Sequence, residues 1–154
     1  MKTTINHGQQ EAIAQLDTIT YWKEIHDWAE QKLEPKELSQ TARRILVDET
    51  DWEDHQDHDT IADCANNWVL EDALEIQVRS DWHALGDGSE PNEFYILLCT
   101  GGPAVRIRGE LEDGYPRRCW LEYQDWGTPW TQHVSSSAPS VLKWYASQFC
   151  WEVA

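Results

Sequence analysis

Apolar residues recur at helical spacing in the first half of the chain and at strand spacing in the second half. Over residues 9–33 they return at steps of three and four, which is typical of one face of an amphipathic helix. These positions are Ile13, Leu16, Ile19, Trp22, Ile25, Trp28 and Ala29. Thr18 and Thr20 leave open a division into two shorter helices, and Pro35 ends the pattern.

Three further helices are predicted from shorter patterns. Residues 36–47 carry enough spaced apolar positions for a short second helix. Thr60 and Asp63 have the spacing of a capping box, with Asp in place of the usual Glu or Gln, and so predict the start of a third helix. A closing helix is predicted over residues 139–150, with Ser140 as its candidate cap.

From Ala73 the period of the pattern changes to two, which predicts β-strands. Leu74, Ile76 and Val78 alternate with polar residues, so the first strand is expected to be half-buried. Residues 94–100 form a continuous apolar run, which is typical of a central strand covered on both faces.

Two more strands are predicted over residues 105–111 and 117–124. Gly101-Gly102-Pro103 and Asp113-Gly114 supply turns between consecutive strands. Because consecutive strands joined by short connections pair with each other, we expect a four-stranded antiparallel meander.

The pattern as a whole predicts a single α+β domain over residues 1–154. It has a helical half (1–70), a β half (72–132) and the closing helix, which packs on the sheet. The aromatic segment that follows the fourth strand allows two interpretations. Trp126 and Trp130 either form an exposed binding ledge or lock the loop against the sheet.

The charge of the chain is concentrated at the joint between the two halves. The net charge is −16, and residues 45–78 contain eleven carboxylates and no Lys or Arg. Such a field attracts basic protein surfaces and repels nucleic acid and anionic membranes, so direct nucleic-acid binding and membrane binding are not expected. The sequence has no run long and apolar enough for a membrane span. The cysteines are widely spaced and are interpreted as reduced core residues of a cytosolic protein: Cys64, Cys99, Cys119 and Cys150.

Part of this acidic stretch has a local explanation. Asp59 and Asp63 suit a helix start, and Glu71, Asp72 and Glu75 suit the entry to the sheet. The remaining residues are predicted to bind a partner, with Trp52 as an apolar anchor: Asp48, Glu49, Asp51, Trp52, Glu53, Asp54 and Asp57. The alternative is a solvated face that contacts nothing.

The search for catalytic chemistry yields one weak candidate. His55 and His58 lie among carboxylates and offer ligands for zinc or manganese, which would make the chain a metal-assisted hydrolase or modifying enzyme. No nucleophile elbow or phosphate-binding loop is present in the sequence. We therefore predict a protein that is not an enzyme and has neither a metal nor another cofactor.

Three segments of the β half, 72–82, 95–111 and 121–130, resemble a family of small, mostly uncharacterised proteins of bacterial phages and plasmids. The resemblance implies a protein that acts in the cytoplasm of a bacterial host and disables its defences, as anti-CRISPR and anti-restriction proteins do, several of them by DNA mimicry. Together with the charge, it predicts an inhibitor whose acidic surface covers the basic nucleic-acid channel of a CRISPR effector or restriction complex. A module that self-associates through exposed Trp side chains is a third possibility.

Overall fold

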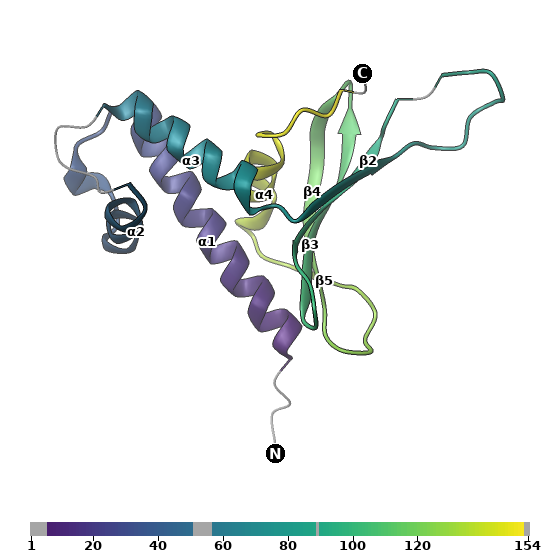
Figure 1. The fold of residues 1–154 in the computed structure, drawn as a ribbon, viewed down its shortest axis with the longest axis horizontal. Helices are drawn as coiled ribbons and strands as arrows, with labels where there is room; N and C mark the ends of the chain where they lie inside the picture. Colours follow the sequence, from purple (N-terminus) through teal and green to yellow (C-terminus); the bar gives the residue numbers. More distant parts are fainter. Residues whose placement is uncertain (1–5, 51–56, 89, 153–154) are drawn as a thin grey trace, which may run out of the picture.

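The computed structural model describes residues 6–50, 57–88 and 90–152. In this part of the chain, a layer of helices covers one face of an antiparallel sheet (Figure 1). The α+β class is confirmed, but the sheet has five strands where the sequence predicts four.

Helix α1 (His7–Glu30) runs the length of the helical layer as one continuous helix. Asn6 caps it by accepting a hydrogen bond from the Gln9 amide at 2.9 Å. The two threonines do not divide the helix, because Thr18 and Thr20 direct their hydroxyls back to the carbonyls four residues earlier, at 3.1 Å and 2.7 Å. Their polar groups are therefore satisfied within the helix.

The second and third helices begin at residues other than the predicted ones. A 3₁₀ turn, η1 (Pro35–Glu37), precedes α2 (Gln40–Thr50). Helix α3 (His58–Asp72) begins earlier than the predicted capping box, and its N-cap is Asp57. The capping-box prediction was wrong, because Thr60 lies inside the first turn of α3 and Asp57 occupies the N-cap position.

The sheet is a meander in the order β1-β2-β3-β4-β5. Its strands are β1 (Glu75–Arg79), β2 (Glu93–Cys99), β3 (Ala104–Glu112), β4 (Tyr115–Gln124) and β5 (Thr131–His133). Strand β5 was not predicted, because its three residues have no apolar alternation. It exists by pairing with β4, where His133 lies opposite Leu121.

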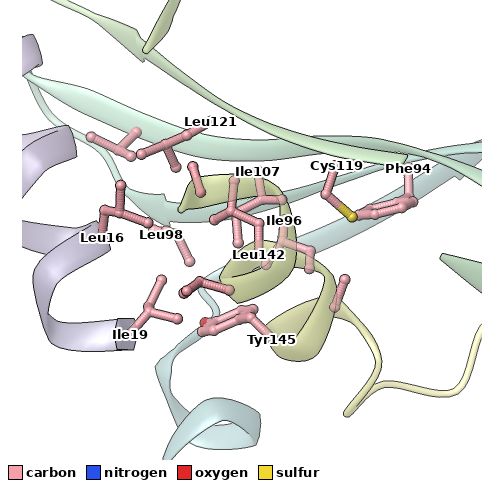
Figure 2. Close-up of a cluster of buried hydrophobic side chains, with 14 of the residues drawn as sticks. Leu16, Ile19, Phe94, Ile96, Leu98, Ile107, Cys119, Leu121, Leu142 and Tyr145 are labelled. Carbon is pink, nitrogen blue, oxygen red and sulfur yellow. The ribbon is translucent and has the colours of Figure 1, made fainter. Parts of the chain in front are cut away.

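The main core lies between the sheet and the helices (Figure 2). We call it the sheet cluster. Leu16 and Ile19 of α1 meet Leu142 and Tyr145 of α4 (Ala138–Ala146) above alternate residues of the central strands. These strand residues include Ile96, Leu98, Ile107, Cys119 and Leu121.

Helices cover only this one face of β2, so the prediction of a strand covered on both faces was wrong. Its burial alternates, with Phe94, Ile96 and Leu98 buried and the intervening residues half-buried. Tyr95 and Leu97 are half-buried on the other face, where Leu97 lies opposite Glu75 and Arg106 of the neighbouring strands.

A second core, the helical cluster, lies at the far end of the helical layer from the sheet. It consists of Ile25, Trp28, Ala29, Leu38, Ala42, Leu46, Ile61 and Ala62. Trp28 is 3% exposed, and its indole N–H donates to the carbonyl of Glu34 at 2.9 Å. This contact fixes the turn between α1 and α2, so α2 is held against α1 and α3 without touching the sheet cluster.

The first strand differs most from its prediction. All five residues of β1 are exposed, and Ile76 and Val78 are 39% and 45% exposed. They do face the helical side of the sheet, since they lie opposite Ile96 and Phe94. The helices end before they reach this edge, and the β1–β2 hairpin extends away from them (Figure 1).

No described helix is long and apolar enough to cross a membrane.

A buried hydrogen bond ties the last residue of α3 to α4. The Tyr145 hydroxyl, which is fully buried, donates to Asp72 Oδ2 at 2.7 Å. Burial raises the pKa of Asp72, and the hydrogen bond from Tyr145 opposes this in part. The negative end of the helix dipole is a further unfavourable neighbour for this carboxylate.

We expect Asp72→Asn to raise the free energy of unfolding at neutral pH by less than about 1 kcal/mol, since solvent screens a half-exposed group. Because the pKa of Asp72 is higher in the fold than in the unfolded chain, the ionised carboxylate lowers stability as pH rises through the folded pKa. The gain over wild type should therefore shrink when urea unfolding is repeated at about pH 3.5. If the stability gain of Asp72→Asn over wild type were larger at acid pH, the ionised Asp72 would stabilise the fold, contrary to this prediction.

Candidate functional site

The acidic surface lies where α2 ends and α3 begins, at the end of the helical layer away from the sheet (Figure 1). We call it the acidic end and define it by the exposed carboxylates of Asp48, Glu49, Asp57, Asp59 and Asp63. Helix α2 turns Ala42 and Leu46 into the helical cluster, so its last two carboxylates face solvent. Asp48 and Glu49 are exposed, and their predicted role in binding a partner stays a prediction.

Helix α3 also buries its apolar residues and leaves its acidic residues exposed. Ile61, Ala62 and Ala65 are buried, so Asp59 and Asp63 lie on the opposite, exposed face. They are four residues apart, a spacing at which like charges cost about 0.2–0.5 kcal/mol. Helix formation favours Asp59 in the first turn but gains nothing from Asp63.

Asp57, one of the predicted partner-binding residues, has a structural role as well. Its side chain accepts a hydrogen bond from the Asp59 amide at 3.2 Å and caps α3. Four other predicted residues, Asp51, Trp52, Glu53 and Asp54, lie outside the described residues, as does His55.

Several carboxylates elsewhere in the chain are paired with bases, whereas those of the acidic end have no such pair among the described residues. Lys23 pairs with Asp27 at 2.5 Å on α1, and Arg106 pairs with Glu122 at 2.8 Å on the sheet. Among ion pairs between described residues, none includes a carboxylate of the acidic end. The carboxylates at this end are therefore unpaired within the described residues, and the nearest bases along α2 are the exposed Arg43 and Arg44, about one turn before Asp48.

His58 is held by structural contacts on the first turn of α3. Its Nε2 lies 3.0 Å from the carbonyl oxygen of Leu33, and its ring centroid lies 4.8 Å from that of Trp28. One ring nitrogen is thus engaged in the fold and only the other remains for a ligand. The described ranges contain no group of three or more His, Cys, Asp or Glu side chains that could hold a metal ion. The metal-assisted alternative built on His55 and His58 stays a prediction.

The cysteines are poorly suited to nucleophilic chemistry. Burial raises the pKa of the Cys119 thiol to about 12, and burial also raises the pKa of Cys99. Both are therefore thiols at neutral pH. The prediction that all four cysteines are core residues holds for Cys119 alone. Cys64 and Cys99 are half-buried, and Cys150 is exposed because it follows the end of α4.

The face of the sheet that is not covered by helices carries a second organised surface, which the sequence pattern did not predict. Arg106 lies at its centre, with its guanidinium 4.0 Å from the ring centroid of Trp130 and 5.8 Å from that of Tyr95. Arg108 and Arg118 lie 5.9 Å and 5.3 Å from the ring of Trp120. We call these six residues the arginine–aromatic face.

Acidic residues neutralise this face. Glu122 accepts hydrogen bonds from Arg106 and from the Trp120 indole, and Glu93 pairs with Arg79 and Arg108. A pocket of about 260 Å³ beside β1 is lined by several of these groups. The arginines of this face already have carboxylate partners. The face therefore contributes to stability and does not offer free cations to phosphate groups. In the sequence, this face corresponds to the alternating Arg, Trp and Glu residues of the strands. Only the register between strands shows that these side chains lie together.

Trp126 and Trp130, which the sequence allows either as an exposed binding ledge or as a lock against the sheet, differ from each other in the structure. Trp130 is half-buried beneath Arg106 and locks its segment to the sheet. Trp126 is 78% exposed, and its indole lies over Gly102, where an added Cβ would come within 2.0 Å of the indole nitrogen.

Comparisons with protein-family models, with curated proteins and with solved structures found no match for the chain.

Proposed function

We propose that this protein inhibits a nucleic-acid-processing complex of a bacterial host, of the CRISPR effector or restriction type, by covering its basic nucleic-acid channel with the acidic end. In this proposal the chain is a binding protein and the partner surface is rich in Lys and Arg. The observation that carries it is the set of exposed carboxylates on α2 and α3 that have no basic partner within the described chain.

The physical basis is competition for the same cations. A channel that holds nucleic acid uses Lys and Arg side chains against a line of phosphates, and binding gains from the release of counterions. Carboxylates fixed on a folded scaffold offer the same cations a comparable negative field. The helical cluster supports this use, because it holds the end of α2 and the start of α3 rigidly while leaving their acidic side chains in water.

Four of the predicted partner-binding residues lie outside the described residues and enter this proposal by their sequence alone. Asp51, Glu53 and Asp54 add negative charge between the end of α2 and the start of α3. Trp52 among them supplies the aromatic anchor that charged interfaces commonly use.

The test is a plasmid-interference assay in bacteria that carry an active CRISPR or restriction system. Expression of wild type should raise the number of transformants to that of a strain without the defence system. The variant Asp48→Lys/Glu49→Lys/Asp57→Asn should lose this effect, since its affinity for a basic channel falls by about a hundredfold or more. Asn at position 57 keeps a good helix cap, so the variant is expected to fold.

A matched control separates position from net charge. Asp17→Lys/Asp87→Lys/Glu152→Gln changes the charge by the same amount at exposed sites outside residues 45–78. It should inhibit like wild type. If the acidic-end variant inhibits fully, or if wild type inhibits neither class of defence system, the proposal is wrong.

A further inference from the structure

Strand β1 is an edge strand with a free side and an uncovered apolar face. It pairs only with β2 in the sheet order, and every one of its residues is exposed. Leu74, Ile76 and Val78 line one face at 59%, 39% and 45% exposure. An open edge with apolar side chains is a template for another strand, and proteins normally block such edges.

The sequence of β1 is complementary to itself in antiparallel orientation. Its five residues read Glu-Ile-Gln-Val-Arg, so a two-fold axis at Gln77 places Glu75 opposite Arg79 of the partner subunit. The same register places Ile76 opposite Val78 of the partner subunit. Opposite charges and apolar pairs directly across two strands both favour pairing. A pairing shifted by two residues would place Glu75 opposite a glutamine.

Contacts within one chain hold both charged side chains on one face of the sheet, where their partners Tyr95 and Glu93 belong to β2. Glu75 accepts hydrogen bonds from Gln77 at 2.7 Å and from the Tyr95 hydroxyl at 3.0 Å. Arg79 donates through Nε to Glu93, and a guanidinium has further donors at its terminal nitrogens. Both side chains therefore lie on the same face of the sheet, Glu75 near one end of β1 and Arg79 near the other.

The loop that follows β1 supplies the apolar cover that an interface here needs. Trp82 and Leu85 are fully exposed, at 104% and 106%. In the same register Ser80 lies opposite Leu74 of the partner subunit, so the loop of each copy runs beside the start of the other copy's β1. Figure 1 shows that the hairpin formed by β1 and β2 projects away from the helices.

We propose that two copies of this chain associate through antiparallel β1–β1 pairing, which joins their sheets into one continuous sheet across a two-fold axis. The occupant of the open edge is a second copy because the register gives Glu75 and Arg79 each an additional neighbour of opposite charge, beside the existing Arg79–Glu93 pair, and covers the apolar face at once. This association uses the end of the molecule opposite to the acidic end, so it is independent of the proposed inhibition.

The test measures mass in solution by light scattering over a range of concentrations. Wild type should reach twice the chain mass of 17.9 kDa. Glu75→Arg and Arg79→Glu should each raise the dimer dissociation constant by about tenfold or more, since each places like charges opposite each other twice. An equimolar mixture of the two variants should restore the dimer. In the mixed dimer the two substituted side chains carry opposite charges and face each other, and the two unchanged side chains form the wild-type pair.

Restoration in the mixture also shows that both variants fold. Val78→Lys, a change at an exposed position, should give a monomer with an unchanged far-UV CD spectrum. The proposal is overturned if wild type is a monomer at all concentrations, or if a dimer forms that neither the charge variants nor Val78→Lys weaken.

Discussion

Trp28→Ala is expected to lower the free energy of unfolding by about 3–5 kcal/mol, because it removes the largest side chain of the helical cluster. The indole fills the space among α1, α2 and α3 and donates to the Glu34 carbonyl. Its ring also packs on His58, at the first turn of α3. The cavity would therefore loosen both helices that carry the acidic end.

Urea unfolding followed by far-UV CD measures this loss. Trp126→Ala is the matched control, since Trp126 is 78% exposed and its removal should change stability by less than about 0.5 kcal/mol. Because the helical cluster is separate from the sheet cluster, the Trp28 variant should also lose protection of α2 amides from hydrogen exchange before that of β3 amides. Equal stability of the two Trp variants would show that the helical cluster is not a true core.

Gly109→Ala is expected to lower the free energy of unfolding by about 1–3 kcal/mol or more. An added Cβ would lie 2.3 Å from the Phe94 ring and 2.7 Å from the backbone oxygen of Arg118. The Phe94 ring cannot move away easily, because Trp151 packs on it with a centroid distance of 4.4 Å. Strand propensity alone gives the opposite sign, since glycine is among the poorest residues in a strand.

Thermal unfolding of Gly109→Ala beside Gly88→Ala distinguishes the two expectations. Gly88 has no heavy atom within 4 Å of an added Cβ, so its variant should unfold within a degree or two of wild type, about 0.5 kcal/mol or less. If Gly109→Ala is as stable as this control, the packing of Phe94 over the glycine is not as described.

The periodicity of the sequence predicts well which face of an element is apolar, but it predicts poorly which other elements cover that face. The inward face of β4 and most buried positions of α1 follow from period alone, as Leu121 and Ile19 illustrate, whereas Ile13 of the predicted helical face is exposed. The same reasoning fails at β1, because alternation tells which face Ile76 takes but not whether a helix reaches it. Strand β5 fails for a related reason: its place comes from pairing with β4 and leaves no periodic trace.

The candidate sites show the same limit. Exposure of Asp48 and Glu49 could be predicted from their charge, although the predicted helix ended at residue 47 and α2 continues to Thr50. The arginine–aromatic face could not, since Arg106 and Trp130 meet only through strand register and the loop before β5. Asp57 combines both cases, because charge density suggested a partner while the helix uses the residue as a cap.

The proposed function requires the acidic end to bind the basic channel of a nucleic-acid-processing complex. Immobilised wild type and the Asp48→Lys/Glu49→Lys/Asp57→Asn variant should be compared by capture from a bacterial lysate, with bound proteins identified by mass spectrometry. Wild type should capture a nucleic-acid-processing complex that is released by added DNA or RNA and by salt, since screening at high ionic strength weakens such contacts. The variant should not capture that complex. Equal capture by both proteins, or retention of the captured complex in competing nucleic acid and high salt, would contradict the account.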